Sequence, residues 1–153
     1  MKLQITDPAT PDVAALLGEH LADMHASSPA CSVHALDVER LRAPGVTFVA
    51  ARGDDGALLG VGALSRLSPD HAEIKSMRTA AARRGAGVGR AVLDHLVAIA
   101  RHEGLTRVSL ETGTTAAFFA AHRLYERAGF ERCAPFAHYT VDPHSRYYTL
   151  ALT

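Results

Sequence analysis

Apolar and polar residues follow a strand-like pattern in six segments of the chain. These segments cover residues 2–6, 46–52, 58–67, 72–79, 106–112 and 145–152. Each is short, rich in alternating or β-branched residues, and bounded by turn-forming residues. The glycines and aspartates of residues 53–56 predict a tight turn, so we expect the second and third segments to pair as an antiparallel hairpin.

Helical periodicity occupies most of the intervening chain. Pro11 opens a first helix whose apolar face carries Val13, Leu16, Leu17, Leu21 and Met24. Small and polar residues from 25 to 32, including Pro29, predict an interruption, after which Asp37 caps a shorter helix bearing Val38 and Leu41. A third helix follows Gly89 and ends near Gly104. A fourth is capped by Thr114 or Thr115 and stops at Gly129.

The order of the elements predicts the fold class. A strand at 72–79, a long helix and a strand at 106–112 form a right-handed crossover with the two strands parallel. The other strands favour antiparallel pairing. We therefore expect an α/β fold, with a mixed, strongly twisted, mainly antiparallel sheet and helices on both faces. At 153 residues and 48% hydrophobic content, residues 1–153 suit a single domain.

Composition narrows the class of protein. Sixteen basic residues balance sixteen acidic ones, so the chain lacks the charge of a nucleic-acid binder. No segment has the roughly 18 uninterrupted apolar residues of a membrane span, and the N-terminus does not fit a signal peptide. Two distant cysteines make no disulfide framework, and Cys133 is interpreted as a small buried residue. We expect a cytoplasmic protein.

The run from Arg84 to Arg90 is a glycine-rich turn between a strand and a helix. Glycines at 85, 87 and 89 allow a sharp turn, and the first N–H groups of the following helix face outward. This combination binds phosphate. A dinucleotide fingerprint would need glycine at Arg90, and a P-loop would need Gly-Lys-Ser or Gly-Lys-Thr, so neither fits. A cluster of basic residues surrounds the turn, namely Arg78, Arg83, Arg84 and Arg90.

The turn and two flanking elements together resemble the GCN5-related N-acetyltransferase (GNAT) superfamily. Arg84-x-x-Gly87-x-Gly89 is similar to its acyl-CoA pyrophosphate loop. Glu73, eleven residues before Arg84, resembles the catalytic glutamate of histone-acetylating members. The run 123–130 resembles the Leu-Tyr-x-x-x-Gly-Phe element, whose tyrosine, here Tyr125, lies beside the thioester sulfur. The resemblance is strongest from Glu73 to Phe130, and its details are similar to a subgroup of small bacterial acetyltransferases.

The resemblance implies acetyl-CoA as co-substrate, no metal, and a parallel strand pair that splays at the acyl-CoA site. The nine histidines also lack a metal-ligand spacing. The residues expected to bind the co-substrate are Met77, Arg78, Thr79, Arg84, Gly85, Ala86, Gly87, Val88, Gly89 and Arg90.

Glu73 is the expected base, acting through water, and Tyr125 the expected acid. Glu73 has an alternative interpretation as an exposed carboxylate paired with Lys75 or Arg78, and Tyr125 as a core aromatic. Glu111 points to the same side of its strand as Ser109 and could replace Glu73 as base.

The acceptor site is expected to include His34, Arg78 and Glu111, with His25 and His138 as further candidates. Arg78 has a planar fork suited to a carboxylate or phosphate, and a salt bridge to Glu73 or Glu111 is the alternative. Two positions depart from the family pattern. Ala81 replaces a proline, and Phe118 replaces an asparagine that often contacts the co-substrate.

These features predict an acetyl-CoA-dependent N-acetyltransferase that transfers acetyl directly to the amine of a small or amino-acid-like acceptor. One alternative is acetylation of a protein lysine or N-terminus. Another is a non-catalytic acyl-CoA sensor, but a sensor would need neither Glu73 nor Tyr125. The expected partner is a small-molecule amine, with no nucleic acid and no membrane, and the resemblance is compatible with a homodimer.

Overall fold

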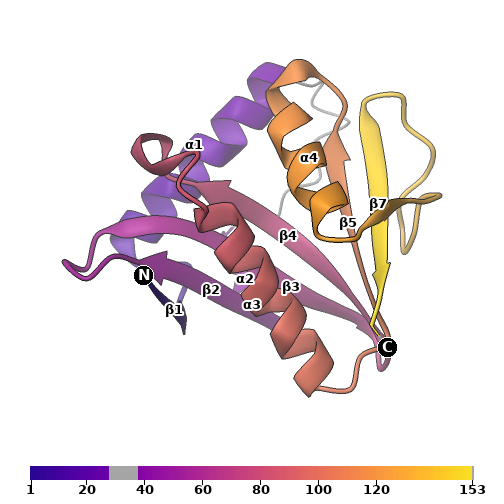
Figure 1. Ribbon diagram of the computed structural model, residues 1–153, viewed down its shortest axis with the longest axis horizontal. Coiled ribbons are helices and arrows are strands. Elements are labelled where there is room, and N and C mark those ends of the chain that lie inside the picture. The colour runs from indigo at the N-terminus through magenta and orange to yellow at the C-terminus, as the bar shows by residue number, and fades with distance from the viewer. Residues whose placement is uncertain (28–37, 153) are drawn as a thin grey trace.

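The computed structural model describes residues 1–27 and 38–152. Within them, seven strands form one sheet in the order β1-β2-β3-β4-β5-β7-β6 (Figure 1). The pairing is antiparallel except between β4 and β5, which run parallel. The strands are β1 (Lys2–Ile5), β2 (Val46–Arg52), β3 (Leu58–Ser68), β4 (His71–Thr79), β5 (Arg107–Gly113), β6 (Glu131–Arg132) and β7 (Ser145–Ala151). The predicted mixed, mainly antiparallel sheet with one parallel pair is confirmed.

Helices cover both faces of this sheet, as the sequence predicted. In Figure 1, α3 crosses the near face over β2, β3 and β4, α4 lies beside it, and α1 lies behind the sheet. Two short 3-10 segments precede α3 and α4. The elements are α1 (Pro11–Ser27), α2 (Val38–Leu41), η2 (Ala81–Arg83), α3 (Val88–His102), η3 (Ala116–Phe118) and α4 (Phe119–Arg127).

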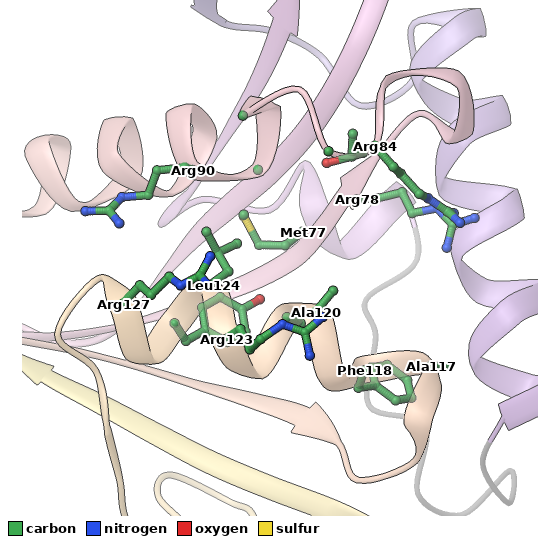
Figure 2. Close-up of a pocket in the computed structure, with 16 residues that line it drawn as sticks. Met77, Arg78, Arg84, Arg90, Ala117, Phe118, Ala120, Arg123, Leu124 and Arg127 are labelled. Carbon is green, nitrogen blue, oxygen red and sulfur yellow. The ribbon is translucent and has the colours of Figure 1, made fainter.

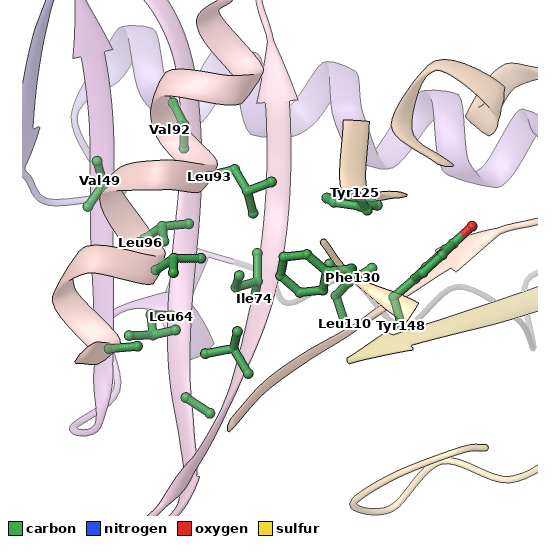
Figure 3. Packing of buried hydrophobic residues seen from close by; sticks show 14 of the residues in the cluster. Val49, Leu64, Ile74, Val92, Leu93, Leu96, Leu110, Tyr125, Phe130 and Tyr148 are labelled. Atoms are coloured by element: carbon green, nitrogen blue, oxygen red, sulfur yellow. The ribbon is translucent and has the colours of Figure 1, made fainter. Parts of the chain in front are cut away.

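The alternation of side chains along the strands divides the interior into two hydrophobic clusters. Val49 points toward α3, whereas its neighbours Phe48 and Ala50 point toward α1 and α2. The cluster under α3 extends from Val92, Leu93 and Leu96 to Tyr125, Phe130 and Tyr148 (Figure 3). The smaller cluster joins α1 and α2 to the opposite face through Val13, Leu16, Leu17 and Leu41.

Strands β4 and β5 separate partway along their length. Their parallel ladder ends at the pair Ile74 and Leu110, although β4 continues to Thr79. On its other side, β4 has an irregular register with β3 between Val61 and Ala63, and Ser76 there has a φ of 57°. Such a bulge bends the strand, so the end of β4 diverges from β5. The splay that the family resemblance implied is therefore present.

Three details of the secondary structure differ from the sequence prediction. Helix α1 runs to Ser27, so the interruption expected at His25 does not begin there, while Pro29, His34 and Asp37 lie outside the described residues. Thr115 occupies the N-cap position of η3, and this segment precedes α4.

The predicted side-chain cap by Thr114 or Thr115 is wrong. Thr115 makes no capping hydrogen bond, and the Thr114 hydroxyl donates to the Pro143 carbonyl instead. The short strand β6 was not predicted, because two residues carry no periodicity. In the part of the chain described, no helix is long and apolar enough to cross a membrane.

Candidate active site

The glycine turn leads from the end of β4 into the first turn of α3. Gly85 and Gly87 both have a φ of 82°, in the left-handed region that glycine adopts without steric cost. Gly87 is the N-cap residue of α3, and no side chain forms a capping hydrogen bond there. The first N–H groups of α3 are left for another partner. This end of the helix has the positive dipole and free donors of an anion site.

A cavity of about 930 Å³ lies between this turn, the end of β4 and α4. In Figure 2, Met77 from β4 and Leu124 from α4 lie between the two helices. The residues that line the cavity are Met77, Arg78, Thr79, Arg84, Gly85, Gly87, Gly89, Arg90, Ala117, Phe118, Ala120, Ala121, Arg123, Leu124, Tyr125 and Arg127. Eight of the ten residues expected to bind the co-substrate are in this set. Ala86 and Val88 are not, and the Val88 side chain is buried in the core.

Five arginines line the cavity, and two of them were missed by the sequence reasoning. Arg78, Arg84 and Arg90 belong to the predicted basic cluster, whereas Arg83 does not reach the cavity lining. Arg123 and Arg127 come from α4. Their spacing of four residues places them on one helix face, which was the available signal. The cavity is therefore strongly basic as well as partly apolar, as a phosphate-bearing ligand requires.

Tyr125 belongs to both the cavity wall and the hydrophobic core. Its ring packs against Phe130 and Tyr148 at centroid distances of 5.9 and 6.0 Å. Burial, with a smaller contribution from the charge of Glu111, raises the pKa of the Tyr125 hydroxyl well above its ordinary value. The hydroxyl is therefore protonated at neutral pH. Its position suits a proton donor, although its ring also serves the core.

Glu73 lies on the opposite face of the sheet, because it alternates with Ala72 and Ile74, which pack under α3. Its side chain is 3% exposed. The Tyr139 hydroxyl donates to Glu73 Oε2 at 2.6 Å, and Lys75 Nζ donates to the same oxygen at 3.3 Å. The alternative interpretation of Glu73, an exposed carboxylate paired with Lys75 or Arg78, was right about the partner Lys75 and wrong about the exposure of Glu73. Glu73 is the acceptor in a buried polar cluster.

Glu111 lies on the same face of β5 as Ser109, as predicted from alternation. Burial, followed by the nearby charge of Glu73, raises the pKa of Glu111 from 4.5 to about 7, while Lys75 acts in the opposite direction. Among the described residues, the Glu111 carboxylate takes part in no hydrogen bond or ion pair. Glu111 is thus a partly exposed carboxyl group whose pKa is near neutral pH.

The remaining candidates for acceptor binding are dispersed. Arg78 lines the cavity. His138 is exposed and stacks on the Tyr139 ring at 4.6 Å. His34 and the side chain of His25 lie outside the described part of the chain. Of the residues that the structure places, no three His, Cys, Asp or Glu side chains are grouped as a metal site would require.

The positions that depart from the family pattern keep the fold intact. Ala81 begins η2 where a proline was expected. The Phe118 ring lines the cavity and packs on Gly113 so closely that a Cβ there would lie 2.3 Å from it. Cys133 is partly buried, and burial raises the pKa of its thiol, in agreement with an unreactive cysteine.

The model of the acetyltransferase (GNAT) family matches residues 14–130 of this sequence. The chain belongs to this family. It is 46% identical to the N-acetyltransferase YsnE of Bacillus subtilis, over 99% of this chain and 100% of that protein. It is 47% identical to the N-acetyltransferase YedL of Escherichia coli, over 96% of this chain and 92% of that protein. These matches identify the chain as an N-acetyltransferase.

Solved structures share the fold. A crystal structure assigned as an acyl-CoA N-acyltransferase from Klebsiella pneumoniae superposes with a TM-score of 0.82 and 25% identity. The match covers 99% of this chain and 97% of that one. The family resemblance inferred from the glycine turn is therefore confirmed.

Proposed function

We propose that this N-acetyltransferase passes the acetyl group of acetyl-CoA directly to the amine of a small or amino-acid-like acceptor. The observation that supports the proposal is that the basic cavity and two carboxylates lie on opposite faces of the sheet, where β4 and β5 separate. The basic cavity reaches the splay of β4 and β5 from the α3 side, and the carboxylates Glu73 and Glu111 lie on the other side. One domain, residues 1–153, carries both.

The residues of the cavity fit acetyl-CoA. The N-terminus of α3 and its glycine turn match a pyrophosphate, and the five arginines match the negative charge of the nucleotide end. Beyond its bulge, the edge of β4 that faces β5 has no strand partner among the described residues, so its backbone groups are open to an extended amide-containing arm. When bound, acetyl-CoA supplies the thioester whose acyl group is transferred.

Two proton transfers are needed, and different side chains of the site perform them. Tyr125 is protonated and lines the cavity, so it donates a proton to the departing thiolate. A carboxylate on the opposite face, Glu73 or Glu111, removes the proton from the acceptor amine.

A panel of amines tests the proposal. Primary alkylamines, arylalkylamines, amino acids and amino-acid amides are incubated with acetyl-CoA and the full chain, and free thiol is measured with each product confirmed by mass. We expect acetylation of at least one small amine, with intersecting initial-velocity lines that indicate a ternary complex. Acetylation of peptides alone would favour a protein acceptor. Tight acetyl-CoA binding without turnover on any amine or peptide would favour a sensor.

A further inference from the structure

We propose that Glu111 is the base that receives the proton of the acceptor amine, and that Glu73 is a positioning residue. The inference rests on the proposed function and assigns roles within that same site. Glu73, Lys75 and Tyr139 form a closed polar cluster, whereas Glu111 follows directly after the last residue of the β4–β5 ladder, where the two strands separate.

The contacts of Glu73 leave it poorly placed to reach a substrate proton. A general base must come within hydrogen-bond distance of that proton, directly or through one water. Glu73 is 2% exposed, and its Oε2 already accepts hydrogen bonds from Tyr139 and Lys75. Lys75 also donates to the Tyr139 hydroxyl at 3.3 Å, so the three groups hold one another. Removing a partner would leave a buried charge, which indicates a structural role for the cluster.

Glu111 stands where the two strands part. The parallel register pairs Glu73 with Ser109 and Ile74 with Leu110, after which the ladder ends. Continued by one step, the same register sets Lys75 level with Glu111 as the first pair beyond the ladder. The Lys75 ammonium is held in the closed cluster by Glu73 and Tyr139, so Glu111 is the carboxyl group left at this level of the two strands. Within the described chain Glu111 has no hydrogen-bond partner to displace.

The electrostatic surroundings of Glu111 suit a base at neutral pH. Burial and Glu73 raise its pKa to about 7, where it accepts a proton readily and still exists largely as carboxylate slightly above that pH. The titratable groups that interact electrostatically with Glu111 lie on β4, on α4, on β7 and in the loop that precedes β7. They are Glu73, Lys75, Tyr125, Tyr139, Asp142 and Tyr147.

The proton balance of the transfer is complete with these groups. Glu111 takes one proton from the acceptor ammonium and releases it to solvent. The neutral nitrogen forms a bond to the thioester carbonyl carbon, and the carbon–sulfur bond breaks. Tyr125 gives its proton to the sulfur and recovers one from the nitrogen as the amide forms. The products are the N-acetylated acceptor, the free thiol of CoA and one proton.

Nuclear magnetic resonance tests the titration of Glu111 without substrate. The carboxyl carbons of glutamate are labelled in the full chain, and Glu111 is assigned from the signal lost in Glu111→Gln. We expect this carboxyl to titrate near pH 7 and to titrate at lower pH in Glu73→Gln, because a repelling charge is removed. Titration of Glu111 near pH 4.5 in both proteins would overturn the assignment.

The pH dependence of the rate, measured with the fastest amine of the panel, tests which carboxylate is the base. In the wild-type chain, kcat/KM is expected to fall below pH 7 with the Glu111 titration. In Glu111→Gln this acidic limb of the kcat/KM profile, the decrease below pH 7, should be absent. The variant should turn over about 100-fold to 10,000-fold more slowly near neutral pH, with partial recovery at high pH. Glu73→Gln should keep the limb but move it to lower pH. Tyr139→Phe, which opens the cluster without removing a carboxylate, should also keep it.

Two results would contradict different levels of the proposal. If Glu73→Gln loses the limb and Glu111→Gln retains it, Glu73 is the base and the inference is overturned, while the acetyltransferase function stands. If the wild-type chain acetylates no amine at all, the proposed function fails, and the role of Glu111 in it fails as well.

Discussion

The Tyr139 hydroxyl donates a hydrogen bond of 2.6 Å to the Glu73 carboxylate across 66 positions of sequence. The bond ties the loop before β7 to the middle of β4. Because the acceptor is a buried carboxylate, the bond is expected to be stronger than one between neutral groups. It also fixes the Tyr139 ring, which packs on Phe136 and Tyr147 at 5.2 and 5.6 Å.

We expect Tyr139→Phe to lower the free energy of unfolding by roughly 1.5–3 kcal/mol, the range for a hydrogen bond to a charged group. Urea denaturation measures this difference. Tyr147→Phe is a matched control, because its hydroxyl donates to the neutral Thr140 carbonyl at 2.9 Å. The control should cost about 0.5–1.5 kcal/mol. Equal losses in the two variants would show that the charge of Glu73 adds nothing.

Tyr125→Phe is expected to slow turnover while it leaves acetyl-CoA affinity nearly unchanged. Only the hydroxyl is removed, and the ring continues to pack on Phe130 and Tyr148. Loss of a general acid lowers the rate by about 100-fold to 10,000-fold. Steady-state rates and calorimetric titration with CoA separate the two effects.

Tyr148→Phe provides the control for Tyr125. Tyr148 is a fully buried neighbour that donates to Glu126 at 2.6 Å and does not line the cavity. Its loss should reduce stability but leave turnover near the wild-type value. Equal turnover of Tyr125→Phe and the wild-type chain at all pH values would assign Tyr125 to the core alone.

Glu111→Gln is expected to stabilise the chain at high pH. The folded state holds the Glu111 proton with a pKa of about 7, against an ordinary value of 4.5, so folding favours the protonated form. Wild-type stability is therefore expected to fall as pH rises from 4.5 through 7, by at most roughly 3 kcal/mol for this group. The variant lacks this loss. Thermal melting at pH 5 and pH 8 measures it, with the exposed Glu131→Gln as control.

If the gain in melting temperature of Glu111→Gln over the wild-type chain is equal at pH 5 and pH 8, the result contradicts the raised pKa of Glu111. An advantage that grows toward pH 8 would support it independently of any substrate.

The fold was predictable because its strands and long helices carry strong periodic signals. Alternation placed Glu111 beside Ser109 and opposite the core, and the glycines at 85 and 87 marked a backbone that needs positive φ. The cap of the fourth helix was less predictable. Either Thr114 or Thr115 suits an N-cap, but Thr114 finds a better acceptor in the Pro143 carbonyl, which only the tertiary structure brings near.

The polar surroundings of the two carboxylates were not predictable from the sequence. Tyr139 lies in an irregular loop, so no periodicity indicates that its hydroxyl reaches Glu73. The pKa of Glu111 likewise depends on burial and on a charge carried by a neighbouring strand. Sequence patterns specify which face a residue occupies, but long-range contacts decide which of two carboxylates is accessible.

Arg127→Ala is expected to weaken acetyl-CoA binding about 1.4-fold to 5-fold, because an exposed ion pair contributes roughly 0.2–1 kcal/mol. The loss should shrink at high salt. Arg101→Ala is the control, since Arg101 is an exposed arginine in the last turn of α3 that does not line the cavity. Isothermal titration at two salt concentrations makes the comparison. A larger effect from Arg101 would place the nucleotide outside the cavity.

Calorimetric titration of acetyl-CoA into Gly87→Asp tests the binding site most directly. The new carboxylate would stand at the N-terminus of α3, where it would occupy the anion site and repel a pyrophosphate. Gly56→Asp is the matched control, because Gly56 also has a positive φ, 84° against 82°, and open space around it. We expect at least about tenfold weaker binding for Gly87→Asp and wild-type affinity for the control. Unchanged affinity in a folded Gly87→Asp chain would contradict the account.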